Sequence, residues 1–262
     1  MNESSNHIIE LQNLSIGYKK KTVADGLNAF IDKSEIVSLI GPNGIGKSTL
    51  LKTITGELRP KKGDVLIYGK PIEKYSRSQL AHKISLVSTE TDSSIGGLRV
   101  KELVGLGRDP FTGFFGKLSA LDKEIVSQAL KSVGLNEKAE SYFGNLSDGE
   151  RQKAMIARVL AQKTPIIILD EPFSFLDPSA RIEIFLMLKE EVYKHGKVVI
   201  LSTHDVSQAL RMSDTLWMMG DKSFYISSKT DPFLSDRLKS LYPSDFVEFS
   251  NDVKDFVPII AL

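Results

Sequence analysis

Short apolar segments recur along the chain, separated by stretches with helical spacing. Four of them are apolar at nearly every position, as is typical of strands covered on both faces. They are Ile36–Ile40, Ile84–Val87, Ile166–Leu169 and Val198–Leu201. Such strands alternating with helices indicate a parallel α/β sheet. Two earlier segments, Ile8–Leu14 and Gly63–Tyr68, alternate between apolar and polar beside turn residues, so we expect a small antiparallel sheet on the N-terminal side.

Between about Asp92 and Thr164 the strand pattern disappears. The spacing of apolar positions predicts helices over Val100–Leu106, Asp122–Val133 and Glu150–Ala161. We interpret this stretch, about residues 92–163, as a helical lobe inserted into the α/β core. Because the chain has no internal repeat and no low-complexity tract, we expect one domain over residues 8–240. Residues 241–262 form a tail in which no motif is recognisable.

Composition narrows the function classes. The chain has 262 residues, and 41% of them are apolar, which is enough for a packed core. Lys and Arg number 34 against 33 Asp and Glu, so there is no bulk basic field to bind nucleic acid. The absence of cysteine excludes disulfides and thiolate metal sites. With no apolar run of about 20 residues and no export signal, we expect a cytosolic setting.

The sharpest motif is Gly41-Pro42-Asn43-Gly44-Ile45-Gly46-Lys47-Ser48, which fits G-x-x-x-x-G-K-[ST]. It lies between an expected strand and a helical run, Thr49–Thr55, that Gly56 stops. Glycines let backbone N–H groups approach phosphate oxygens. We expect Lys47 to place a positive charge near the β and γ phosphates, and the Ser48 hydroxyl to ligate Mg²⁺. The motif predicts a P-loop NTPase core.

Two acidic residues, Asp170 and Glu171, follow the apolar segment Ile166–Leu169 and precede Pro172. Carboxylates at the end of a buried strand are costly without a cation or a hydrogen-bonding role. We expect Asp170 to act on Mg²⁺, directly or through water, and Glu171 to polarise the attacking water. The alternative is a surface turn after an edge strand.

A third motif, Leu146-Ser147-Asp148-Gly149-Glu150-Arg151-Gln152, leads into a helical run. Ser147 and Glu150 have capping-box spacing, so a well-capped helix is sufficient as a local explanation. At this point the chain resembles the nucleotide-binding subunits of ABC transporters, whose signature L-S-x-G-E-x-Q lies between the phosphate loop and the acidic strand, as it does here. The three motifs in this order are far more specific than any one of them.

The resemblance implies a head-to-tail homodimer that holds two ATP molecules between its protomers. In such a dimer, Ser147 and the backbone N–H of Gly149 face the γ-phosphate of ATP held by the second protomer. A positive helix end suits an anion of this kind.

Other family positions match one by one. Tyr18 is similar to the aromatic residue that stacks on adenine, although a lone tyrosine also fits a core position. Thr49 continues the phosphate-binding motif. Asp177, in Ser174-Phe175-Leu176-Asp177, is similar to the segment that couples the two sites across the dimer, and His204 is similar to the histidine that contacts the γ-phosphate.

The chain departs from the family pattern twice. Where the family usually has a glutamine at the start of the helical lobe, this chain offers Thr89 or Glu90. We favour Glu90, because a carboxylate can still ligate Mg²⁺. Ser34-Glu35 stands where Gly-Glu commonly precedes the phosphate-loop strand, and we expect this to alter only a turn.

The resemblance runs from about Ile8 to Thr230, which leaves no room for a fused membrane domain. Within the lobe, Val100–Pro110 resembles ATPases that serve importers of siderophore-bound iron, haem and vitamin B12. We therefore expect an ATPase subunit at the cytoplasmic face of the membrane, bound to a separate permease and acting indirectly with a substrate-binding protein. An exporter ATPase and a soluble ABC-type ATPase of a cytosolic assembly are the alternatives. Phe111, Phe114 and Phe115 could receive a permease helix or belong to the lobe's core.

Overall fold

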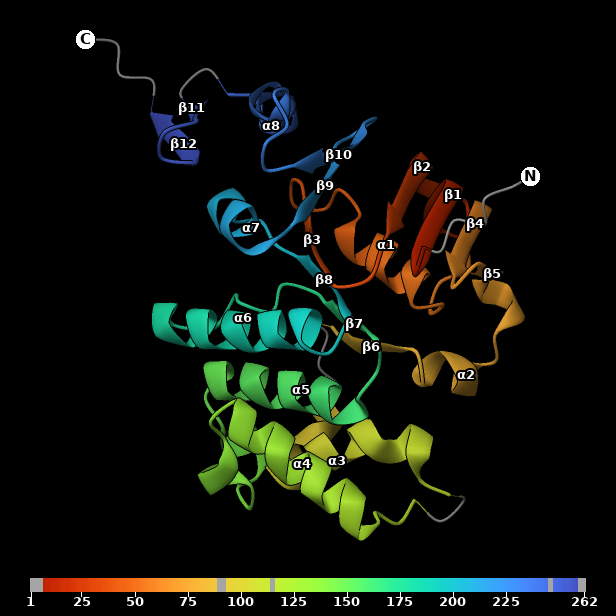
Figure 1. Cartoon of the computed structure of the whole chain (residues 1–262), viewed down its shortest axis with the longest axis vertical. Coiled ribbons are helices and arrows are strands. Elements are labelled where there is room, and N and C mark those ends of the chain that lie inside the picture. The colour runs from red at the N-terminus through yellow and green to blue at the C-terminus, as the bar shows by residue number, and fades with distance from the viewer. Residues whose placement is uncertain (1–6, 89–92, 114–115, 245–246, 259–262) are drawn as a thin grey trace. The chain divides into compact units, whose positions relative to one another are not determined.

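The computed structural model describes residues 7–88, 93–113, 116–244 and 247–258. It forms two compact units (Figure 1): one from residues up to Tyr75 and from Val198 onward, the other from Ser76–Lys197. Among the helices of the described ranges, none combines the length and the apolar character needed to cross a bilayer.

In the first unit, four strands lie in the order β10-β9-β3-β8. Strand β3 pairs in parallel with both β8 and β9, and β10 pairs antiparallel with β9. The bounds are β3 Glu35–Ile40, β8 Val198–Ser202, β9 Thr215–Met219 and β10 Phe224–Ser228. Strand β8 is buried at every position and β3 at all but the first, which is why both are continuous apolar runs in the sequence. The predicted parallel pairing is confirmed.

The same unit contains the expected antiparallel sheet, in the order β2-β1-β4-β5. Its strands are β1 Ile9–Tyr18, β2 Lys21–Ile31, β4 Lys62–Ile67 and β5 Lys70–Pro71. Helix α1 (Lys47–Ile54) buries Leu50, Leu51 and Ile54, and a short 3₁₀ turn, η1 (Ile72–Lys74), follows β5. The prediction of this sheet is confirmed, and its longest strand, β2, had not been predicted.

In the second unit, strands β6 (Ile84–Val87) and β7 (Ile166–Leu169) pair in parallel. Its helices are α2 Arg77–Ala81, α3 Val100–Gly105, α4 Ala120–Ser132, α5 Asp148–Gln162 and α6 Pro178–Tyr193. The 3₁₀ turns are η2 Ser93–Gly97, η3 Leu106–Phe111, η4 Asn136–Lys138 and η5 Phe143–Asn145. Helices α3, α4 and α5 pack on one another (Figure 1), which confirms the three predicted helices.

A buried ion pair joins three elements of the second unit. Arg108 in η3 donates from Nε to Asp122 of α4 at 2.9 Å and from a terminal guanidinium nitrogen to the Ala161 carbonyl of α5 at 2.8 Å. The Ser119 hydroxyl also donates to Asp122, at 2.6 Å. The hydrogen bond from Ser119 makes the largest contribution and that from Arg108 the next, and together they lower the pKa of Asp122 to about 2. The carboxylate therefore stays ionised inside the lobe.

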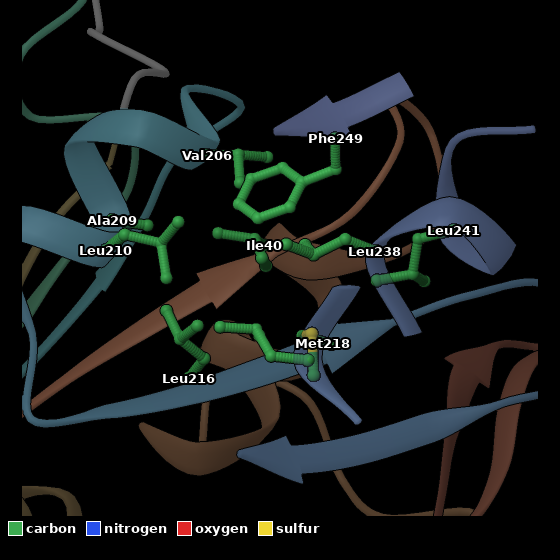
Figure 2. Close-up of a cluster of buried hydrophobic side chains, with 10 residues drawn as sticks. Ile40, Val206, Ala209, Leu210, Leu216, Met218, Leu238, Leu241 and Phe249 are labelled. Carbon is green, nitrogen blue, oxygen red and sulfur yellow. The ribbon is translucent and has the colours of Figure 1, made fainter. Parts of the chain in front are cut away.

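The C-terminal part of the chain packs into the core of the first unit. Its elements are α7 Val206–Met212, α8 Leu234–Leu241, β11 Val247–Ser250 and β12 Asp255–Pro258, the last two forming an antiparallel hairpin. Figure 2 shows Phe249 of β11 directed toward Val206 of α7 and Ile40 of β3, and its side chain is only 4% exposed. The tail thus contributes to the same apolar cluster as the strand that precedes the phosphate loop.

Candidate nucleotide-binding site

The predicted phosphate loop joins β3 to α1, and α1 begins inside the motif, at Lys47. Its N-cap residue is Gly46, which provides no side-chain cap, and its first turn has no acidic residue. Helices α2, α4, α5, α6 and α7 each have a Ser or Asp side chain that caps their first turn. Since an uncapped helix N-terminus favours anions, the start of α1 is suited to a phosphate group.

Two glycines of the loop are required by close contacts. Gly41 has φ +154°, and a Cβ atom there would lie 2.2 Å from the carbonyl oxygen of Met219. Gly46 has φ +115°, and a Cβ atom there would lie 2.3 Å from a methyl group of Val23. Both the backbone conformation and the space therefore make a side chain costly at these two positions.

Lys47 is the charged group of the loop. It is buried, and its ammonium donates to the carbonyl oxygens of Gly41 at 2.8 Å and Pro42 at 3.2 Å. The charge is thus held within the loop that carries the predicted phosphate contacts. Ser48 and Asn43, also predicted site residues, are exposed.

Tyr18 lies at the end of β1 and its side chain is 46% exposed, so it is not a core residue. The Thr49 hydroxyl of α1 is 3.5 Å from the Tyr18 hydroxyl. The structure therefore brings the candidate adenine-stacking residue to the first turn of the helix that follows the phosphate loop.

His204 is exposed and follows the C-terminal end of β8. Because β8 is parallel to β3, the C-terminal ends of the two strands lie at one edge of the sheet. The backbone N–H of Thr203 donates to the Leu39 carbonyl at 3.1 Å, which continues the pairing up to that edge. Asp205, the next residue, caps α7 by accepting from the Gln208 N–H at 2.8 Å. His204 and the phosphate loop thus share the edge at which α/β proteins bind ligands.

The two acidic candidates belong to the second unit. Asp170 follows β7, is 4% exposed, and its backbone N–H donates to the Val87 carbonyl at 2.9 Å. Glu171 has φ +49°, a left-handed conformation that is uncommon for residues other than glycine. The Ser174 hydroxyl donates to its carboxylate at 3.3 Å. Backbone strain of this kind clusters at functional sites.

Ser147 caps α5, as the local explanation of its motif predicts. Its hydroxyl accepts from the Glu150 N–H at 3.4 Å, and the Glu150 carboxylate accepts from the Ser147 N–H at 3.0 Å. Glu150 also pairs with Lys138, and the hydrogen bond from Lys138 is the main cause that lowers the pKa of Glu150. The first turn of α5 therefore already has a carboxylate partner on its own chain.

The start of α5 contacts the segment that contains Asp177. A Cβ atom on Gly149 would lie 3.0 Å from the carbonyl oxygen of Phe175. Asp177 caps α6, accepting from the Ala180 N–H at 2.9 Å and from the Ser179 hydroxyl at 2.6 Å. These two hydrogen bonds, with that from Ser179 the larger, hold the pKa of Asp177 below its usual value. The second unit therefore brings the Ser147 motif and the Asp177 segment together.

Some predicted positions fall elsewhere. Thr89 and Glu90, the candidates for the usual glutamine, lie outside the described residues, as do Phe114 and Phe115. Phe111 is 41% exposed, and the guanidinium of Arg108 lies 4.1 Å from its ring centre. Ser34 has φ +55°, so it adopts in its turn the left-handed conformation that a glycine adopts more easily.

Two residues beside the loop were missed at the sequence level: Val23 of β2 and Met219 of β9, which limit the space at Gly46 and Gly41. No motif marks either of them. Their apolar character was the only available signal, and it does not say which strand lies against the loop.

The family model described as "ABC transporter" matches residues 24–174. The chain is 35% identical to the achromobactin transport ATP-binding protein of Dickeya dadantii, over 88% of this chain and 85% of that protein. It is 38% identical to the iron(3+)-hydroxamate import ATP-binding protein of Bacillus subtilis, over 78% of this chain and 76% of that protein. Among solved structures, a dimeric ATP-binding cassette in a post-hydrolysis state with ADP and Pi matches at a TM-score of 0.75 and 29% identity, over 84% of this chain and 98% of that one.

Proposed function

The chain belongs to the family of ATP-binding proteins of ABC transporters, which are ATPases, and from this premise we propose that it powers an importer of iron–siderophore or related metal-chelate cargo. The observation that carries the cargo proposal is its similarity, over more than three quarters of both chains, to the hydroxamate and achromobactin proteins. The resemblance of Val100–Pro110 to this importer class also favours an importer ATPase over an exporter ATPase or a soluble assembly ATPase.

ATP is held, in this proposal, chiefly by the first unit. Backbone N–H groups of Gly41–Thr49 and the Lys47 ammonium bind the β and γ phosphates, and Tyr18 stacks on adenine. The uncapped start of α1 and the positive φ of Gly41, Gly44 and Gly46 support this role. His204 contacts the γ-phosphate from the same edge of the sheet.

Mg²⁺ fits the donors that the chain offers, because a serine hydroxyl and carboxylates are hard oxygen ligands. Ser48, Asp170 and Glu90 would hold the ion, which neutralises charge on the phosphates when bound. Glu171 positions and polarises the attacking water. Its left-handed backbone and the hydrogen bond from Ser174 support a fixed orientation of this carboxylate.

Two copies of the chain act together in this proposal, as in the dimeric cassette to which it is similar. Ser147 and Gly149 of one copy then face the nucleotide of the other, and Asp177 couples the two sites. The exposed Phe111, resting on the buried Arg108, is suited to receive an apolar permease helix at the cytoplasmic face of the membrane.

The role of Glu171 is tested by Glu171→Gln. We expect this variant to bind ATP as the parent does and to lose about 10²–10⁴-fold in turnover, which is the usual contribution of a positioned base. Phosphate release and nucleotide affinity are measured on the same preparation. Glu183→Gln on the exposed face of α6 is the matched control and should leave turnover unchanged. Parental turnover in Glu171→Gln would refute the assignment.

The transport role is tested by expressing the chain with a candidate ferric-siderophore permease. Uptake of a radiolabelled ferric siderophore should require both proteins and should be abolished by Glu171→Gln. A chain that never copurifies with membranes, even with that permease present, would favour the soluble assembly ATPase. Export of a labelled compound in place of uptake would favour the exporter.

A further inference from the structure

The start of α5 differs in charge from the start of α1, although both are proposed above to face phosphate. The first turn of α1 has no acidic residue, whereas the first turn of α5 contains Asp148 and Glu150. A carboxylate stabilises the positive end of its own helix but repels a second anion that approaches the same end. The acidic first turn of α5 therefore opposes the binding of a γ-phosphate from a partner copy unless its charge is offset.

Each of these two acids has a basic partner within the second unit. Lys138, at the end of η4, forms an ion pair with Oε1 of Glu150. Arg151, three residues after Asp148, lies 3.3 Å from its carboxylate and also donates to the Gly144 carbonyl at 2.7 Å. The side chain of Asp148 is 72% exposed, whereas that of Glu150 is 27% exposed. Because water screens the charge of Glu150 less, the cation that pairs with Glu150 matters more.

The carboxylate of Glu150 has its main partner in Lys138. Oε1 pairs with the Lys138 ammonium, and Oε2 accepts from the Ser147 N–H at 3.0 Å, which completes the cap of α5. The hydrogen bond from Lys138 lowers the pKa of Glu150 most, that from the Ser147 N–H less, and that from the Ser147 hydroxyl least of the three. The carboxylate thus depends little on the proton of the Ser147 hydroxyl.

The capping box at the start of α4 shows the alternative arrangement. It has the same spacing, with Ser119 at the N-cap and Asp122 three residues later. There the Ser119 hydroxyl donates to the carboxylate at 2.6 Å and makes the largest contribution to its lowered pKa. The proton of that serine is committed to the cap of its own helix. In α5 the Lys138 ammonium is the main donor instead, which leaves the Ser147 proton for a phosphate oxygen.

We propose that Lys138 is a positioning residue for the binding of ATP between two copies of the chain. By pairing with Glu150, it offsets the negative charge at the start of α5 and spares the Ser147 hydroxyl. Ser147 and Gly149 can then receive the γ-phosphate of the partner copy. Lys138 has this role only in the dimer proposed above, and it acts through Glu150 without touching the nucleotide.

The test measures ATP-driven dimerisation of the full chain in the Glu171→Gln background, in which hydrolysis is slowed. Sedimentation in saturating MgATP gives the dimer dissociation constant. One charge interaction at a helix end is worth about two- to fivefold, and each dimer contains two starts of α5. We therefore expect Lys138→Gln to weaken the dimer by about four- to twenty-five-fold and Lys138→Arg, which keeps the charge, to restore it.

A second change, Glu150→Gln, separates this role from a structural one. Glutamine still accepts from the Ser147 N–H, so the capping box is kept while the charge is removed. In a chain with Glu150→Gln, adding Lys138→Gln should leave the dimer constant unchanged, because no carboxylate remains to be offset. With Glu150 in place, the loss caused by Lys138→Gln should shrink as the ionic strength rises from about 0.05 to 0.5 M. Lys131→Gln, at an exposed lysine in the last turn of α4, is the control and should dimerise as the background chain does.

Equal dimer constants for Lys138→Gln and the background chain would overturn the assignment. An equal loss from Lys138→Gln with and without the Glu150 carboxylate would identify a purely structural role and would also overturn it. Lys138 is 47% exposed, so we expect its variants to fold, and urea unfolding checks this. The affinity of each variant for MgADP, measured by calorimetry, should match that of the background chain. A background chain that binds MgATP but never dimerises would refute the proposed dimer, and the role of Lys138 with it.

Discussion

The close contacts in the phosphate loop predict that two of its glycines differ greatly in their tolerance of alanine. At Gly41, a Cβ atom would lie 2.2 Å from the Met219 carbonyl oxygen, whereas at Gly44, which has φ +75°, it would meet no atom within 4 Å. The loop motif G-x-x-x-x-G-K-[ST] requires a glycine at position 41 and allows any residue at position 44. It does not say how much stability a substitution costs at either position. Comparing Gly41→Ala with Gly44→Ala therefore tests whether β9 limits the space at Gly41.

The expected magnitudes follow from two effects. An alanine at Gly44 has only the left-handed backbone to accommodate, at about 1–2 kcal/mol. An alanine at Gly41 has a comparable backbone penalty of about 1–3 kcal/mol. It must also displace a backbone oxygen by roughly 1 Å, since carbon and oxygen rarely approach closer than about 3 Å, and overpacking of this kind costs about 1–3 kcal/mol more. We expect Gly41→Ala to lose about 2–6 kcal/mol of a stability that is typically about 5–15 kcal/mol.

The assay is urea unfolding followed by the fluorescence of Trp217. This is the chain's single tryptophan, it is fully buried, and it lies on β9 two residues before Met219, so it reports on the strand that must move. ATP affinity is measured in parallel and should fall in Gly41→Ala, because the displaced loop carries the proposed phosphate contacts. Equal stability losses in the two variants, or a larger loss in Gly44→Ala, would refute the close contact between Gly41 and the Met219 carbonyl oxygen.

Two further predictions concern stability. Phe249→Ala should lower the free energy of unfolding in urea by about 3–5 kcal/mol, because the ring is 4% exposed within a shared cluster. Val247 is 37% exposed on the same strand, so the control Val247→Ala should cost less than about 1 kcal/mol. Equal costs would contradict the packing of the tail. Asp122 has a folded pKa of about 2, against 3.8 for an unperturbed aspartate, so its stabilising contribution is present above pH 3.8 and is lost as the pH falls toward 2. Asp122→Asn should be less stable at neutral pH, because Arg108 stays buried without its anion, and its urea midpoint should depend less on pH between 4 and 2; an unchanged pH profile would contradict this.

Much of the fold was predictable because burial on both faces leaves a direct trace in the sequence. The segments Ile36–Ile40 and Val198–Leu201 are apolar throughout, and both are parallel strands in the structure. Strand β2 was missed because it alternates weakly, with Lys21, Thr22 and Asp25 among its first five residues. Its position is decided by pairing with β1, which is a long-range contact.

The candidate site residues were proposed for a different reason. The phosphate loop, the acidic pair and the Ser147 motif are each contiguous in the sequence, so each can be recognised without knowing the fold. The residues that each motif contacts in the folded chain could not be predicted from the motif. That Tyr18 reaches Thr49, and that Gly149 meets Phe175, depends on the packing of separate elements.

The sequence by itself determined local features: the loop motif between a strand and a helix, four of the buried strands, and the capping serine at Ser147, whereas the buried strand β9 was not predicted. Only the tertiary structure decided that Phe249 of the tail joins the cluster at Ile40, and that Met219 of β9 limits the space at Gly41. The physical reason is that a motif depends on neighbours along the chain, whereas burial and close contacts depend on neighbours in space, which only folding brings together.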